Sequence, residues 1–157
     1  MDGNPMKKAI RSLMIALLAL PLALQAADDA AAALDPVLQQ AREAASRKDF
    51  AAAAALLRDA LAKTPANPDY HNLYAYAVRN GPHPNMDLVF KHYTEALRLA
   101  PKHRGAHEYI GEAYLMVGNV PKAREHLTQL DRLCFFGCAE YSSLKKAIRD
   151  HEAKGAR

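Results

Sequence analysis

The sequence predicts an all-α fold, a right-handed solenoid of about three helical hairpins followed by a C-terminal capping helix. The chain copies itself, so that Ala53, Val89 and Ala123 occupy equivalent positions 36 and then 34 residues apart. Internal periods of this size are typical of helical solenoids. Apolar side chains recur at spacings of three and four residues within the copies, which indicates amphipathic helices. Prolines that follow capping residues mark where several of these helices are expected to begin.

The first unit is expected to form helices over 36–47 and 50–63. Asp35 followed by Pro36 has the order of a helix cap and a proline in the first helical turn. Pro65 closes the unit, because proline cannot continue a regular helix.

The second unit is expected to form helices over 68–80 and 86–99. Asn67 precedes Pro68 in the same order of cap and proline. The loop NGPHPN between the two helices contains two prolines, which prevent a tight helical turn. Apolar residues at helical spacing define the inward side of the first helix; they are Tyr70, Leu73, Tyr74, Ala77 and Val78.

The third unit is expected to form helices over 104–117 and 121–133, and a seventh helix follows over 139–153. Asn119 and Pro121 mark the start of the second of these helices. The last unit of a repeat stack needs a cap with a polar outer side, and the seventh helix has one apolar and one charged side. The apolar side carries Tyr141, Leu144, Ala147, Ile148 and His151, and the other carries Lys145, Lys146, Arg149 and Asp150.

The repeated unit resembles the tetratricopeptide repeat, a helical hairpin of 34 residues. The third copy resembles it most, with Gly111, Tyr114, Gly118 and Ala123 at the offsets of the family's packing residues. The second copy matches less well and the first least. The resemblance covers about residues 34–133. It implies three repeats and then a cysteine loop with a capping helix, at about 35–67, 68–102, 103–133 and 134–157.

Two positions depart from the family's pattern. The tryptophan that is common early in the repeat is absent, and Val37, His71 and His107 stand in its place. Phe135 stands where a proline is expected after the third repeat.

Residues 1–27 are expected to be a cleaved signal peptide, and 28–34 a flexible leader. A basic start, an apolar run over 13–24 and small residues near position 27 follow one another, which is the build of a secretory signal peptide. The run is shorter than the roughly 20 residues of a membrane-spanning helix, and Pro21 interrupts it. We therefore expect an exported, periplasmic protein without a stable membrane span after cleavage; a retained anchor is the alternative.

The charge of the chain gives no support to nucleic acid as a partner. Cleavage after residue 27 removes three basic residues and one acidic residue, so the formal charge falls from +4 to +2. The remaining basic residues are interspersed with acids and form no block. The chain also has no Gly-rich phosphate loop, nucleophile elbow or paired zinc motif. We therefore expect neither a cofactor nor an enzymatic activity.

The histidines are the remaining signal for metal chemistry. His71 and His107 occupy one repeat position, and His92 and His126 occupy another. Copying of the repeat accounts for both pairs, and a pair of metal or proton sites is the alternative. His103 lies four residues before His107, the spacing of two ligands on one helix, but no convincing third ligand accompanies them. We assign no metal site.

Cys134 and Cys138, the only cysteines of the chain, are expected to form a local disulfide, because paired cysteines tend to oxidise in an exported protein. Gly137 permits the backbone angles of a tight turn. Haem attachment requires C-x-x-C-H, which the three-residue spacer excludes. A redox pair or a two-thiolate metal site are the alternatives. At least one of Phe135 and Phe136 is expected to pack beneath the capping helix; an exposed hydrophobic contact is the alternative.

The tetratricopeptide resemblance implies a protein or peptide partner, bound on the inner side of the first helix of each repeat. Glu108 and Glu112 lie one turn apart, so their carboxylates share a face and suit a basic or amine-bearing partner. The lysines with which some family members clamp a peptide carboxylate are missing, so no such clamp is expected. Carried over by alignment, the partner-binding positions are Leu38, Arg42, Asp69, Asn72, Tyr76, Arg79, Glu108, Glu112 and Leu115. For each of them a merely solvated polar face is the alternative.

These features favour a non-enzymatic adaptor or assembly factor. A preformed groove lowers the ordering cost of holding an extended segment. A metal-handling accessory protein with His and Cys ligands, and a structural subunit of an envelope complex, are the alternatives.

Overall fold

A computed structural model describes residues 35–155, which form seven α-helices and contain no β-strand. The expected signal peptide and leader lie outside the described residues. The all-α class predicted from the sequence is confirmed for the described part of the chain. Its helices are α2 (Pro36–Ser46), α3 (Phe50–Lys63), α4 (Pro68–Asn80), α5 (Met86–Leu99), α6 (Arg104–Met116), α7 (Val120–Leu133) and α8 (Ala139–Gly155).

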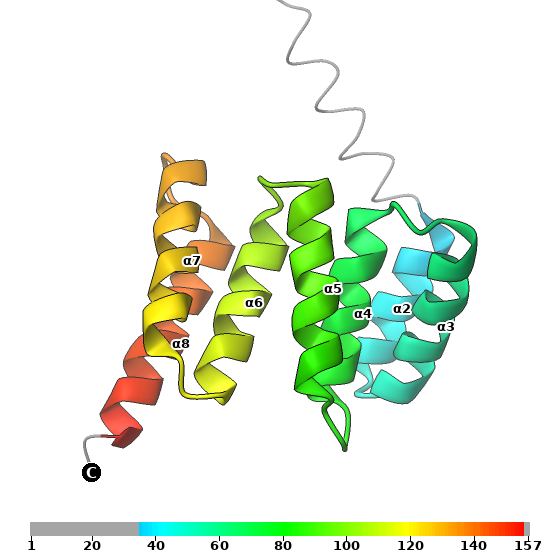
Figure 1. The fold of residues 1–157 in the computed structure, drawn as a ribbon, viewed down its shortest axis with the longest axis horizontal. Coiled ribbons are helices and arrows are strands. Elements are labelled where there is room, and N and C mark those ends of the chain that lie inside the picture. Colours follow the sequence, from blue (N-terminus) through cyan, green and yellow to red (C-terminus); the bar gives the residue numbers. More distant parts are fainter. Residues whose placement is uncertain (1–34, 156–157) are drawn as a thin grey trace, which may run out of the picture. The chain divides into compact units, whose positions relative to one another are not determined.

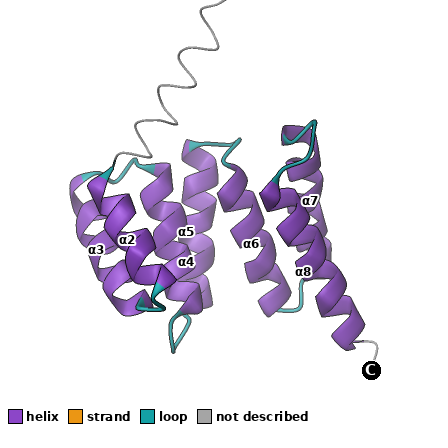
Figure 2. Cartoon of the chain, turned by 180° about the vertical axis from the view of Figure 1, so that it is seen from behind, coloured by secondary structure: helices purple, strands orange, loops and turns teal. Residues whose placement is uncertain are grey.

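The helices of residues 36–155 are arranged in two layers. One layer contains α2, α4, α6 and α8, each of which contacts the next member of the set. In the other layer α3 contacts α2 and α4, α5 contacts α4 and α6, and α7 contacts α6 and α8. Figure 1 shows α3 and α5 in front, and Figure 2, seen from behind, shows α2, α4 and α8 in front.

Side-chain caps explain where the helices begin. Asn67 Oδ1 accepts hydrogen bonds from the backbone N–H groups of Asp69 and Tyr70 at 3.0 and 3.2 Å. Asn85 and Asn119 accept similar bonds at the starts of α5 and α7. Each cap satisfies a donor that the first turn of a helix leaves without an intrahelical partner. The expected helix ranges match the observed ones to within two residues.

The core lies between the two layers. Tyr93, Leu57 and Leu130 from the α3, α5 and α7 layer are fully buried. Leu144 and Ile148 of α8 are also buried and pack with Leu130 of α7. The apolar side expected for the seventh helix therefore covers the end of the helix row, which fits a cap.

Gly111 of α6 lies directly against Leu144 of α8. A Cβ atom at this position would lie 2.6 Å from Cδ2 and 2.8 Å from Cδ1 of Leu144. Leu144 is fully buried, so its side chain has little room to move away.

Gly111→Ala is expected to lower the free energy of unfolding by about 1–3 kcal/mol, because the added methyl group overpacks this contact. Urea unfolding followed by circular dichroism measures the change. Gly105→Ala in the same helix is the matched control, since its Cβ would come no closer than 3.4 Å to a neighbouring atom. Equal effects of the two substitutions would show that the α6–α8 contact is looser than described.

The loop between α7 and α8 is closed by its two cysteines. The sulfur atoms of Cys134 and Cys138 lie at disulfide-bonding distance, 2.08 Å. Gly137 has a positive φ of 82°, a backbone conformation that glycine adopts without strain. Its N–H donates to the carbonyl of Cys134 at 2.8 Å. The expectation of a local cysteine pair agrees with this geometry.

The expectation that Phe135 or Phe136 packs beneath α8 is wrong. Their side chains are 88% and 97% exposed. Leu144 and Ile148 of α8 pack with Leu130 and other core residues, and neither phenylalanine belongs to that cluster. Among residues 35–155, no helix combines the length and the apolar character needed to cross a membrane.

Candidate binding groove

The layer of α2, α4, α6 and α8 carries two cavities. The first, of about 420 Å³, lies between the second half of α2 and the first halves of α4 and α6, and Glu140 at the start of α8 also lines it. The second, of about 380 Å³, is lined by α4, α6 and α8 further along. Glu108 lies on α6 between Gly105, which lines the first cavity, and Glu112, which lines the second. We call the two cavities and Glu108 the groove.

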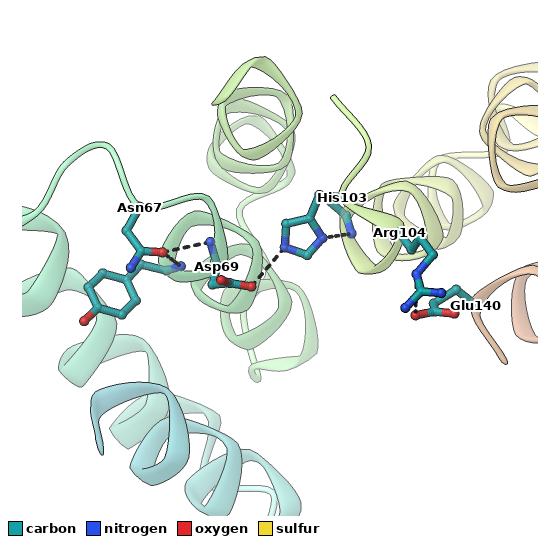
Figure 3. Close-up of polar contacts among 7 residues, drawn as sticks. Asn67, Asp69, His103, Arg104 and Glu140 are labelled. Atoms are coloured by element: carbon teal, nitrogen blue, oxygen red, sulfur yellow. Dashed lines mark hydrogen bonds and ion pairs between the residues drawn. The ribbon is translucent and has the colours of Figure 1, made fainter. Parts of the chain in front are cut away.

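Polar side chains connect the helices at the first cavity (Figure 3). His103 caps α6, because its Nδ1 accepts a hydrogen bond from the N–H of Ala106 at 3.2 Å. Its Nε2 therefore carries the proton and donates to Asp69 Oδ1 of α4, also at 3.2 Å. This hydrogen bond lowers the pKa of Asp69 despite partial burial. Arg104 and Glu140 form an ion pair at 3.6 Å that links α6 to α8.

Asn72 lines the first cavity with an unsatisfied acceptor. The residue is 8% exposed, and within the described chain its Oδ1 has no hydrogen-bond partner. Gly105 of α6 lies beside the Asn72 side chain, and a Cβ at position 105 would make an ordinary van der Waals contact with Asn72 Nδ2 at 3.4 Å. Buried polar atoms in folded proteins are nearly always hydrogen-bonded. Asn72 Oδ1 has less than 1 Å² of accessible surface, so a molecule in the cavity does not reach this atom as the side chain now lies.

Arg79 connects α4 to α6 at the second cavity, which it lines together with Glu112. Its Nη2 donates to Glu112 Oε2 at 2.6 Å, and its Nη1 donates to the carbonyl of Tyr109 at 3.3 Å. Its guanidinium carbon also lies 5.7 Å from the ring centres of Tyr76 and Tyr109. The side chain is only 5% exposed. Arg79 and Glu112 are thus each other's partners, which sequence reasoning missed because the two positions are 33 residues apart.

Glu108 is the carboxylate of the groove that has no cation within ion-pairing distance among the described residues. Burial, the carboxylate of Glu112 and that of Glu140 raise its pKa to about 7, although a hydrogen bond from Ser143 and the more distant charge of Arg79 act in the opposite direction. A half-buried carboxylate with two acidic neighbours stays ionised most readily when a cation binds beside it.

The structure brings most of the sequence-predicted positions to the groove and places two in the core. Asp69, Asn72 and Tyr76 line the first cavity with the exposed Arg42. Leu38 is 1% exposed and packs with Leu57 and Tyr70 in the core. Leu115 is buried at the edge of the second cavity. These two leucines therefore support the groove from below more than they offer surface to a partner.

The equivalent histidines form two matching pairs outside the groove. His71 and His92 approach at 2.8 Å between their Nδ1 atoms, and His107 and His126 approach at 3.0 Å. In each pair the first histidine also bonds through Nε2 to a proline carbonyl six residues earlier, at 2.8 and 3.0 Å. In His71 and His107 the ring proton is therefore on Nε2, and Nδ1 accepts a hydrogen bond. In His92 and His126 the ring proton is on Nδ1, which donates that bond. Each pair therefore links the turn before a helical hairpin, which contains the proline, to the second helix of that hairpin.

The spacing of His103 and His107 does not produce a shared site, because the two rings engage different partners. His103 caps α6 and pairs with Asp69, whereas His107 pairs with His126. Within residues 35–155, no three His, Cys, Asp or Glu side chains gather as metal ligands.

Acid is expected to destabilise the fold through the histidine pairs. Burial and neighbouring charge lower the pKa of both His92 and His126 from an ordinary 6.5 to about 4. The folded state thus favours the neutral rings. The stability that they contribute to the fold is fully present above pH 6.5 and is lost as the pH falls toward 4. After a discount for partial exposure, we expect a loss of about 1 kcal/mol per pair.

Thermal melting at pH 7 and pH 4.5 measures this effect. The double variant His92→Gln, His126→Gln serves as control because it retains the carboxylates that also titrate in acid. It should lose less stability between the two pH values than the wild type. An identical loss in both proteins would mean that the histidine pairs do not sense acid.

No protein-family model matches the chain, and the search of curated proteins found no match either. The function is therefore inferred from the side chains of the groove.

Proposed function

We propose that the chain is an exported tetratricopeptide-repeat adaptor that binds an extended, basic segment of a partner protein in its groove. Three repeats, a capping helix and a periplasmic location belong to the same proposal, and no enzymatic activity is part of it. The observation that carries it is Glu108, a half-buried carboxylate that lies between the two cavities and has no cation within ion-pairing distance among the described residues.

The groove suits a chain segment better than a small molecule. Its two cavities follow the same helix layer on either side of Glu108, so a ligand that reaches both must be elongated. The aromatic rings of Tyr76 and Tyr109 lie 4.9 Å apart beside the first cavity. Aromatic side chains provide contact area at low cost in conformational entropy.

Charge at the middle of the groove favours a basic side chain of the partner, whereas Arg42 and Lys154 place cations in the first and second cavity. Asp69 and Glu140 line the first cavity and have internal partners, His103 and Arg104. Glu108 has no such cation, and burial with two acidic neighbours raises its pKa. A lysine or arginine side chain placed beside Glu108 would supply the missing charge and stabilise the ionised carboxylate.

Support for repeated units comes from the two histidine pairs. Their geometry recurs in two successive hairpins, including the bond to a proline carbonyl six residues earlier. Support for export comes from the N-terminal sequence and from the cysteine pair at disulfide distance.

Photo-crosslinking in the envelope tests the proposed function. The crosslinking amino acid p-benzoylphenylalanine replaces Arg42, an exposed residue that lines the first cavity. The matched control places it at Lys91, an exposed basic residue of α5 in the opposite layer. We expect a discrete protein adduct from position 42 that is absent from position 91. The same adducts from both positions, or none from position 42, would overturn the groove as a binding site.

A further inference from the structure

The second cavity of the groove contains a cation that has no ion-pair partner in the described part of the chain. Lys154, in the last turn of α8, is exposed and lines this cavity of about 380 Å³. Among residues 35–155, no carboxylate lies within ion-pairing distance of its Nζ. The ammonium group can therefore pair with an acid from outside the chain.

The acids of the second cavity already have partners. Glu112 Oε2 accepts a hydrogen bond from Arg79 Nη2 at 2.6 Å. Asp150 Oδ2 accepts one from Lys146 Nζ, also at 2.6 Å. Each acid thus has a cation of its own, and the charge of Lys154 is the one left uncompensated. A group of opposite charge is favoured beside such a cation.

Apolar side chains form another wall of the second cavity. Leu115 and Met116 come from the end of α6, and Ala147 comes from α8. Met116 is 55% exposed, so a ligand that covers it removes apolar surface from water, which is favourable. A short aliphatic stem that ends in a carboxylate matches both the wall and the cation. Acidic side chains have this build.

The second cavity begins one helical turn beyond Glu108. The α6 side chains that line it, Glu112, Leu115 and Met116, come four, seven and eight residues later. A helix rises about 1.5 Å per residue, so these side chains lie roughly 6–12 Å further along its axis. An extended chain rises about 3.3–3.6 Å per residue, and therefore covers this distance in roughly two to four residues.

We propose that the second cavity is an acid-binding subsite, which holds an acidic side chain of the partner segment about two to four residues from the base at Glu108. The subsite rests on the proposed function, because the base at Glu108 fixes where the segment lies. Lys154 pairs with the carboxylate, and the apolar wall contacts its stem. The capping helix α8 thereby discriminates between partners, since a second base would meet like charge at Lys154.

Selection from a library of random peptides displayed on phage tests the subsite on the full chain recovered from the cell envelope. Lys154→Glu reverses the uncompensated charge of the second cavity. Lys145→Glu is the matched control, since Lys145 is exposed on the same helix and lines neither cavity of the groove. Circular dichroism verifies that both variants keep their helix content. The peptides are fused to the coat protein at their C-termini, so any selected acid is a side chain and not a terminal carboxylate.

We expect the peptides selected by the wild type and by Lys145→Glu to carry an acid about two to four residues from a lysine or arginine. Lys154→Glu should select a second base in place of that acid. Bases selected without an acid at this distance, or the same acid selected by Lys154→Glu, would overturn the subsite and leave the proposed function standing. A wild type that selects no base would overturn the proposed function and the subsite with it.

Calorimetry with one selected peptide tests whether Lys154 is the partner of the acid. Replacement of that acid by its amide should weaken binding to the wild type by about two- to fivefold, the range of an exposed ion pair. The same replacement should leave binding to Lys154→Gln unchanged, because the cation is already absent. An equal loss in both proteins would place the acid away from Lys154 and overturn the subsite.

Discussion

Glu112→Gln is expected to lower the free energy of unfolding by about 3 kcal/mol, because removal of one partner leaves a buried charge uncompensated. The charge left behind is that of Arg79, whose side chain is 5% exposed and whose Nη2 donates to Glu112 at 2.6 Å. The guanidinium remains protonated at all accessible pH values, so it cannot relieve the loss by becoming neutral.

Glu152→Gln is the matched control for this prediction. Glu152 also joins two helices, through Arg124 of α7 at 2.5 Å, but the two side chains are 41% and 58% exposed. Exposed ion pairs contribute about 0–1 kcal/mol. Urea unfolding of both variants against the wild type measures the difference. A loss from Glu112→Gln as small as that from Glu152→Gln would mean that Arg79 remains well solvated.

Glu108→Lys is expected to weaken binding of the partner segment by at least about tenfold, because it places like charges together at the interface. Glu108→Gln should have a smaller effect, since it removes the attraction without adding repulsion. The variant leaves Arg79 and Glu112 intact, whereas charge reversal at Glu112 would disturb the fold as well as the groove. Glu125→Lys, on the exposed side of α7, is the control and should bind like the wild type.

Titration calorimetry with the segment captured from the envelope measures these affinities at pH 6 and pH 8. Glu108 has a raised pKa of about 7 in the free protein, and a bound cation favours its ionised form. Affinity should therefore rise from pH 6 to pH 8 in the wild type, with release of a proton on binding below pH 7, and change less in Glu108→Gln. Equal affinities of Glu108→Lys and Glu125→Lys would remove Glu108 from the interface.

The sequence was sufficient for the helices because their signals are local. Caps such as Asn67 and Asn119, prolines and apolar spacing all act within a few residues, and the helix ends followed from them. The closeness of Gly111 to Leu144 was not predictable in the same way, although both residues had been singled out. It depends on how α8 lies across α6, and no local pattern specifies that contact.

The groove was only partly predictable because its side chains have partners far away in the sequence. Glu108 and Glu112 look equivalent in the sequence, one turn apart on α6. Arg79 of α4 pairs with Glu112 and leaves Glu108 without a cation. The exposure of Phe135 and Phe136 was not predictable either, because large hydrophobic residues usually lie in the core. It depends on the course of the short loop that carries them.

Nuclear magnetic resonance of the ¹⁵N-labelled protein, titrated with the captured segment, tests the groove most directly because it locates binding residue by residue. The side-chain amide of Asn72 gives its own pair of signals. We predict that these signals and the backbone amides of α2, α4 and α6 beside the first cavity shift on binding, while the exposed side of α3, α5 and α7 is unaffected. Shifts confined to that other layer, or to the loop at Phe135 and Phe136, with Asn72 unchanged, would contradict the proposed groove.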